Sequence, residues 1–215
     1  MSPIFRNMFI AAAILTSFAV FGGGLVVFTY THTKDIIAAN ERAALLANFH
    51  ALVPEDRYDN ALAKDNIEIK DPAFFGTQEP ITVYRAYQNG KPVAVLATLI
   101  APDGYSGPIK LLVGVYADGT LAGARVLAHQ ETPGLGDAIE TSRSDWIYTF
   151  AGKSLTNPKL KDWAVKKDGG AFDQFTGATI TPRAVVKAIR RFLVYCQRHR
   201  QQLFHSKRTT SGETL

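Results

Sequence analysis

The chain has 215 residues, of which 47% are hydrophobic and 20% are charged, a composition typical of a globular protein. This length accommodates one compact domain with a membrane segment and leaves little room for two full domains. Its single cysteine, Cys196, excludes an internal disulfide bond and a cysteine-based metal site. Much of the net charge of +5 lies in residues 186–215. Such a basic end suits nucleic acid or anionic lipid, but a solvated helix face is its usual cause, and we expect no nucleic-acid partner.

Residues 8–30 contain no charged side chain. At about 1.5 Å per residue, a helix over this run reaches roughly 35 Å and spans a bilayer core of about 30 Å. The alternative is a cleaved signal peptide, whose apolar region is about 7–15 residues long and ends at small residues. This run is longer, and residues 26–28 (Val-Val-Phe) continue it after a glycine triplet. The sequence therefore predicts a retained anchor, with residues 1–31 as tail and transmembrane segment.

Residues 33–53 are predicted to form a helix that leads away from the membrane, and residues 54–60 break it with turn-forming side chains. Two β-hairpins follow, around Asn89-Gly90 and Asp118-Gly119, and both dipeptides are typical of type I′ turns. The predicted strands are residues 81–88, 91–101, 109–117 and 120–128. The expected fold class is α+β: an antiparallel sheet with helices covering one face.

The segments between and after the hairpins are less regular. Residues 102–108 form a loop with Tyr105 at its centre, and residues 129–137 carry two glycines and a proline, which prevent regular structure. Taken alone, residues 129–137 read as a structural turn, because they match neither a P-loop nor a dinucleotide fingerprint. Residues 144–150 are expected to form a short helix, and residues 163–165 a short strand.

The last predicted helix runs from about residue 182 to residue 200, with apolar side chains on one face at i, i+3, i+4 and i+7 spacing. Thr181 is the expected N-cap and Pro182 the expected first helical residue. Cys196 lies on the apolar face, which favours a small core residue over a reactive thiol. Residues 206–215 are polar and are expected to be disordered.

The stretch 173–179, Asp-Gln-Phe-Thr-Gly-Ala-Thr, stands directly before this helix. Thr179 would therefore lie where free backbone amides and the positive end of the helix dipole favour a phosphate. Gly177 and Ala178 are small enough for a planar group to approach the backbone closely. Without further information, a turn followed by a cap explains the same residues.

Other side chains have both a functional and a structural interpretation. Lys166, Lys167 and Arg183 could neutralise a phosphate, or they could simply be solvated. His129 could donate a proton, or it could be a hydrogen-bonded loop residue. The aromatic residues either pack on a flavin ring or belong to the core: Tyr105, Trp146, Trp163 and Phe175. No His/Glu cluster has metal-ligand spacing, so no metal is expected, and no nucleophile-elbow motif is present.

Residues 173–179 resemble the flavinylation motif Asp-x-x-(Ser/Thr)-Gly-Ala-Thr, in which FMN is esterified through its phosphate to the last threonine. Together with four further segments, they make nearly the whole chain similar to the G subunit of the Rnf/Rsx electron-transport complexes. The C subunit of the sodium-pumping NADH:quinone oxidoreductase is a more distant relative. The four further segments are residues 52–58, 101–107, 131–137 and 163–170.

The resemblance implies an FMN-binding domain, residues 32–205 with the leading helix, that carries FMN on Thr179. Thr176 is the second-best acceptor. The residues expected near the cofactor are Gly177, Ala178, Thr132, Leu135, Gly136, Tyr105, Lys166 and Lys167. The resemblance also implies attachment by an FAD-dependent flavin transferase of the ApbE type.

As a family member, the chain would be a flavoprotein subunit of an ion-translocating oxidoreductase of the ferredoxin/NAD type, relaying electrons to and from the other Rnf subunits. It would be a single-pass protein of the bacterial inner membrane whose domain faces the periplasm. Arg6 and the amino terminus before the span nearly balance Lys34 and Arg42 after it, so the side rests on the resemblance. Two alternatives remain open: a flavin-free structural tether and a self-contained FMN reductase.

Overall fold

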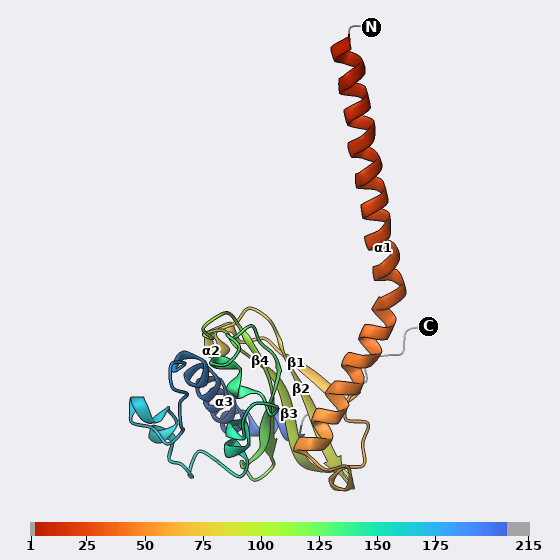
Figure 1. Cartoon of the computed structure of the whole chain (residues 1–215). Coiled ribbons are helices and arrows are strands. Elements are labelled where there is room, and N and C mark those ends of the chain that lie inside the picture. The colour runs from red at the N-terminus through yellow and green to blue at the C-terminus, as the bar shows by residue number, and fades with distance from the viewer. Residues whose placement is uncertain (1–2, 206–215) are drawn as a thin grey trace. The chain divides into compact units, whose positions relative to one another are not determined.

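The structure, a computed structural model, describes residues 3–205. It divides into two compact units, residues 1–47 and residues 48–215. The first helix is α1 (Pro3–Leu52) (Figure 1). Its residues up to 47 belong to the first unit, and its last residues, 48–52, belong to the second.

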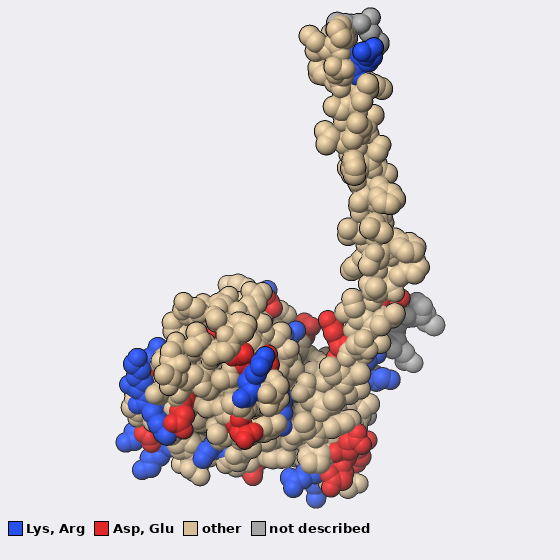
Figure 2. Space-filling view, viewed as in Figure 1, with Lys and Arg blue, Asp and Glu red and all other residues tan. Residues whose placement is uncertain are grey.

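In the first unit, α1 contains a stretch that is long and apolar enough to cross a membrane, and protein buries none of it. Figure 2 shows a long part of this helix without basic or acidic side chains. Hydroxyl groups along it donate to the carbonyl four residues earlier, as Ser17 does to Ala13 (2.8 Å) and Thr29 to Leu25 (2.9 Å). These bonds satisfy the hydroxyls without any external partner, as a lipid environment requires. The predicted anchor and leading helix are parts of this one continuous helix.

The second unit is built on a five-stranded antiparallel sheet in which every strand pairs with its neighbour in sequence. The four predicted strands are present, with two ends shifted by one residue. The short first strand was not predicted, because four residues carry too little alternation to detect. The strands are β1 (Asn66–Ile69), β2 (Ile81–Gln88), β3 (Lys91–Ala101), β4 (Ile109–Tyr116) and β5 (Leu121–Ala128).

The two hairpin turns differ from each other. Asn89 (φ 52°) and Gly90 (φ 73°) both have the positive φ that a type I′ turn requires. Asn89 is the only non-glycine residue with positive φ within residues 3–205, so the type I′ turn expected at Asp118-Gly119 is wrong. There the Asp118 carboxylate accepts hydrogen bonds from the Thr120 amide (2.8 Å) and hydroxyl (2.6 Å). These bonds hold an Asx-type turn, and only Gly119 (φ 93°) needs a left-handed backbone.

Short helical segments connect the sheet to the final helices. They are the 3₁₀ helices η1 (Glu55–Arg57), η2 (Gly136–Ile139), η3 (Trp146–Phe150), η4 (Leu160–Asp162) and η5 (Lys166–Asp168), together with the α-helices α2 (Pro72–Phe75), α3 (Ile180–Arg198) and α4 (Arg200–His205). The expected helix at 144–150 is present as η3. The expected strand at 163–165 is wrong: Val165 makes a single bridge to Phe172, because the chain folds back on itself there. The Phe172 amide donates to the Ala164 carbonyl at 3.1 Å.

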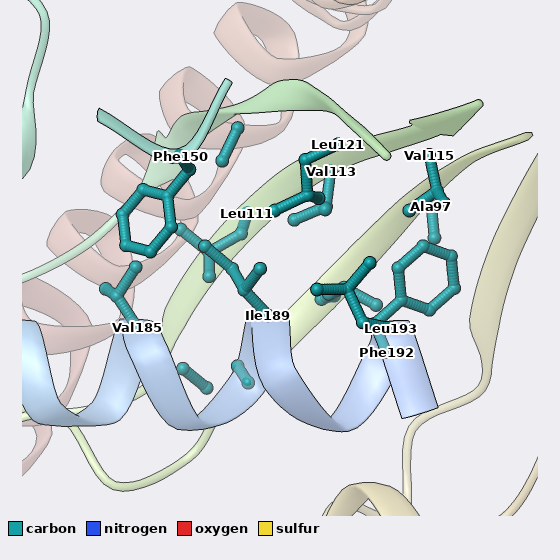
Figure 3. Packing of buried hydrophobic residues seen from close by; sticks show 14 of the residues in the cluster. Ala97, Leu111, Val113, Val115, Leu121, Phe150, Val185, Ile189, Phe192 and Leu193 are labelled. Atoms are coloured by element: carbon teal, nitrogen blue, oxygen red, sulfur yellow. The ribbon is translucent and has the colours of Figure 1, made fainter. Parts of the chain in front are cut away.

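The core lies between α3 and one face of the sheet (Figure 1). Val185, Ile189 and Phe192, at helical spacing, point from α3 toward the strands and belong to the same buried cluster as Leu111 and Val113 (Figure 3). The predicted apolar face is therefore the packed face. A group of aromatic rings extends this core. The ring centroids of Phe150 and Phe172 are stacked at 4.8 Å, and those of Trp163 and Phe172 lie at the same distance with the rings tilted.

Candidate functional site

Three segments that are distant in sequence enclose a cavity of about 310 Å³. One comes from the loop after β3, one from the loop after β5, and one from the turn that enters α3. The residues that line the cavity are Tyr105, Glu131, Thr132, Leu135, Gly136, Gly177, Ala178, Thr179, Ile180 and Thr181.

Thr179 is the N-cap of α3, and its side chain makes no capping hydrogen bond. The first backbone bond of the helix runs from the Arg183 amide to the Thr179 carbonyl at 3.3 Å. The amides of Ile180 and Thr181 precede that bond, and Pro182 has no N–H, so two donors and the positive end of the dipole lie beside the Thr179 hydroxyl. The expected N-cap role of Thr181 is wrong, because α3 begins one residue before it.

The turn before α3 is tight. The Ala178 amide donates to the Phe175 carbonyl at 3.1 Å, and Gly177 has a φ of 80°. A Cβ on Gly177 would be strained there, and it would lie 3.4 Å from Leu135 Cδ2 on the opposite wall. Glycine at this position therefore keeps both the turn and the width of the cavity.

Glu131 connects the three segments and is only 4% exposed. Its carboxylate accepts hydrogen bonds from the amides of Ser106 (3.0 Å) and Tyr105 (3.3 Å) and from the hydroxyl of Thr181. Sequence reasoning included Glu131 in a motif but assigned it no role. The signal that could have found it is a carboxylate directly before the Thr-Pro-Gly-Leu-Gly segment, residues 132–136.

The mouth of the cavity is apolar. Tyr105, Leu135 and Ile180 are 69%, 45% and 43% exposed, although each is a large hydrophobic side chain. Polar backbone donors thus lie at the α3 end, and apolar side chains surround the opening. This arrangement fits a ligand with an anionic end and a planar apolar body, as FMN has.

Seven of the ten residues expected near a cofactor line this cavity, namely Tyr105, Thr132, Leu135, Gly136, Gly177, Ala178 and Thr179. Thr176, Lys166 and Lys167 do not line it. Lys166 Nζ lies 2.5 Å from Asp173 Oδ1, and the Lys167 amide donates to Gln174 Oε1 at 3.2 Å. Both lysines thus brace the loop that leads to Thr179.

The remaining candidates also have structural partners. Arg183 binds Asp168 with two hydrogen bonds, of 2.6 and 2.7 Å, which lower the pKa of the Asp168 carboxyl and raise that of the Arg183 guanidinium. Trp146 and Trp163 are buried core residues, and the ring of Phe175 packs edge-on against Trp146 at 5.2 Å. Within residues 3–205, no cluster of three His, Cys, Asp or Glu side chains could hold a metal ion.

His129 lies outside the cavity that contains Thr179. Its Nδ1 accepts a hydrogen bond from the Glu131 amide (3.0 Å), so Nε2 carries a proton and donates to Glu140 Oε1 at 2.7 Å. This bond, together with one from the Ser142 hydroxyl, holds the pKa of the Glu140 carboxyl below its usual range. His129 is therefore a hydrogen-bonded loop residue that orients the backbone at Glu131.

Comparisons with known proteins agree with this geometry. Residues 104–194 match the FMN-binding domain model, which covers all three segments of the cavity, and residues 1–52 match the model of the RnfG N-terminal region. The chain thus belongs to the class of flavoproteins, and its FMN-binding domain follows an apolar N-terminal helix.

Full-length relatives identify the family. The chain is 46% identical over 200 residues to the G subunit of the ion-translocating oxidoreductase complex of Vibrio atlanticus, covering 93% of this chain and 95% of the relative. It is 44% identical over 203 residues to the protein of that name from Shewanella oneidensis, covering 94% of each. The chain belongs to the family of G subunits of ion-translocating oxidoreductase complexes, which confirms the family predicted from the motifs.

A solved structure is also similar: the C subunit of the Na⁺-translocating NADH-quinone reductase from Parabacteroides distasonis. Its TM-score is 0.43 at 25% identity, over 64% of this chain and 69% of that one.

Proposed function

We propose that this chain is the FMN-carrying subunit of a ferredoxin/NAD-type ion-translocating oxidoreductase, with FMN esterified through its phosphate to Thr179. The observation that carries the proposal is the position of Thr179. Its side chain makes no capping bond, and the residue stands at the start of α3 and lines a cavity with an apolar mouth. An ester there would place a phosphate beside the free amides of Ile180 and Thr181.

Attachment would be catalysed by a separate flavin transferase that uses FAD. The Thr179 oxygen forms a bond to the phosphorus of the FMN half, the P–O bond of the pyrophosphate breaks, and AMP leaves. The hydroxyl proton is lost to the transferase or to water. No oxidant is needed, and Thr179 ends as a phosphodiester. Thr176 is the second acceptor to test.

Bound FMN supplies one- and two-electron redox chemistry. The residues of this chain bind and orient it: Thr132 and Gly136 form the wall of the cavity, and Tyr105, Leu135 and Ile180 its exposed mouth. A flavin held in place has no diffusible product, so its electrons must pass to and from neighbouring subunits of the complex. An open mouth suits that exchange, because a partner can approach the ring edge.

The helix α1 would anchor the chain in the bacterial inner membrane by a single span, with the FMN-binding domain in the periplasm. The side is supported by the family, since the flanking charges are nearly balanced. Alkaline phosphatase fused to the C-terminus should be active, and green fluorescent protein fused there should be dark. Bright cytoplasmic fluorescence would contradict this orientation.

The test of the proposal is the intact mass of the full-length chain produced with and without the flavin transferase. With the transferase, the mass should rise by one FMN less one water, and the denatured protein should stay yellow. Thr179→Ala should lose both signals, while the matched variant Thr176→Ala should keep them. Flavin that washes out of the processed protein in acid or urea would refute covalent attachment.

The relay is tested in the assembled complex. Thr179→Ala should leave the other subunits associated but stop electron flow and the ion transport coupled to it. Full ion transport by the Thr179→Ala complex would favour the structural tether instead.

A further inference from the structure

Glu131 is a buried charged side chain whose hydrogen-bonding capacity is used inside the protein. Two backbone amides and one hydroxyl donate to it, so in each of these three hydrogen bonds the carboxyl group is the acceptor. Tyr105 and Ser106 belong to the loop after β3, whereas Thr181 lies fifty residues from Glu131, in the first turn of α3. The carboxylate therefore joins all three walls of the cavity.

The chain leaves space for this side chain at Gly136. A Cβ on Gly136 would lie 2.8 Å from Glu131 Cβ and 3.0 Å from both Glu131 Oε2 and Thr181 Oγ1. Since real Cβ atoms are essentially never found at 2.8 Å, this loop can close around Glu131 because position 136 lacks a side chain. A Cβ on Gly104 would lie 2.9 Å from Glu131 Oε1, but it would first meet the Gly107 carbonyl oxygen at 2.1 Å, so glycine at 104 is required mainly by its own loop.

The backbone of Glu131 is held as firmly as its carboxylate. Its amide donates to His129 Nδ1, and His129 Nε2 donates to Glu140, so the imidazole is fixed from both sides. A shift of the Glu131 backbone would therefore break the hydrogen bond between its amide and His129. The carboxylate is held on one side by the amides of Tyr105 and Ser106, and the Thr181 hydroxyl of α3 contacts it from the other.

We propose that Glu131 is a positioning residue for flavin attachment, an inference that rests on the function proposed above. Through the Thr181 hydroxyl it fixes the first turn of α3, and therefore the Thr179 oxygen two residues earlier. It also occupies the donors of Tyr105 and Ser106 with its own negative charge. A phosphate is thereby directed to the amides of Ile180 and Thr181, beside Thr179.

The experiment measures flavin transfer to the purified full-length chain made without the transferase, then given transferase and FAD. Initial rates of covalent flavin fluorescence are measured at several chain concentrations, so that kcat and KM separate. Glu131→Gln and Thr181→Val should each lower kcat on the order of ten- to a hundredfold, because small misplacements of a reacting group have effects of this size. Thr181→Ser retains the hydroxyl and should restore the rate.

Three controls separate positioning from general loss of structure. Thr120→Val removes another threonine–carboxylate bond, in the β4–β5 turn, and should transfer flavin normally. Val95→Ala truncates a buried sheet residue and provides a loss of Tm to compare with those of the site variants. The double variant Glu131→Gln/Thr181→Val should be no slower than the slower single variant, because both break the same bond.

The proposal fails if Glu131→Gln transfers flavin at the wild-type rate, or if Val95→Ala of equal Tm loses as much. If Glu131→Gln does not fold, the comparison of Thr181→Val with Thr181→Ser decides, and equal rates for the two would overturn the proposal. A wild-type chain that takes up no flavin at all would instead refute the proposed function. The two failures are therefore distinguishable.

Discussion

Gly136 and Glu131 are in such close contact that a Cβ on the glycine would lie 2.8 Å from the Cβ of the glutamate. Gly136 begins η2, and its backbone φ is not positive, so glycine is needed there for space. By contrast, Gly134 in the same loop has a φ of 78° and open space around its Cβ position. A substitution at Gly136 therefore tests steric crowding, and a substitution at Gly134 tests backbone strain.

Gly136→Ala should lower the free energy of unfolding by about 1–3 kcal/mol, because the added methyl overpacks a buried contact. It should also slow flavin transfer, since Glu131 must move. Gly134→Ala should cost only about 1–2 kcal/mol of left-handed strain and leave transfer unchanged. Urea unfolding and flavin fluorescence measure the two effects, and equal transfer rates for both variants would contradict the expectation.

A second prediction concerns the ion pair between Asp65, which directly precedes β1, and Arg85 on β2. Asp65 Oδ1 lies 2.8 Å from Arg85 Nε and 2.5 Å from Nη2, and both side chains are buried. Asp65→Ala breaks this buried ion pair and should cost about 3–5 kcal/mol in urea unfolding. Lys166→Ala, from a pair whose side chains are 57% and 67% exposed, should cost less than about 1 kcal/mol. Similar costs would show that burial does not decide the strength of these pairs.

The hydrogen bonds from His129 and Ser142 to Glu140 predict a dependence of stability on pH. They hold the pKa of Glu140 below its usual range in the folded chain, whereas in the unfolded chain it returns to about 4.3. The stabilisation is therefore fully present above about pH 4.3 and is lost as the pH falls through the lower folded pKa. Glu140→Gln should make Tm fall less steeply with acidification than in wild type. Parallel curves for the two proteins would contradict this.

Cys196 is buried on the inner face of α3, and burial raises the pKa of its thiol far above the usual range. We expect no reaction with Ellman's reagent in the native protein and one thiol per chain in guanidinium, where the pKa returns to about 8.5. Cys196→Ala should retain the fold. Rapid labelling of the native chain would show that α3 does not pack as described.

Local patterns were sufficient for most of the fold. Alternating strands around Asn89-Gly90 predicted the first hairpin, and helical spacing predicted the face of α3 that packs on the sheet. The start of α3 was misplaced because Thr181 looks like a cap locally, whereas its hydroxyl is bound to Glu131. A pattern of neighbouring residues cannot reveal Glu131 as the partner, because it lies fifty residues away in the sequence.

Only the contiguous part of the candidate site could be predicted from the sequence. Thr179 and its small neighbours are contiguous, so a motif can reveal them. The contacts of Glu131 bridge 25 residues to Ser106 and fifty to Thr181, and only the folded chain brings these groups together. The partners of Lys166 and Arg183 are likewise side chains whose choice depends on how the loop closes.

The simple strand order has a consequence for when Thr179, the proposed acceptor, becomes usable. Because each strand pairs with the one before it, the sheet can assemble as a growing chain emerges, at low cost in loop closure. Thr179 and α3 come last, and the third wall of the cavity exists only after α3 has docked. A transferase that recognises the closed cavity would then meet its target only on finished molecules. Chains that end before α3 would lack the third wall of the cavity and would therefore receive no flavin.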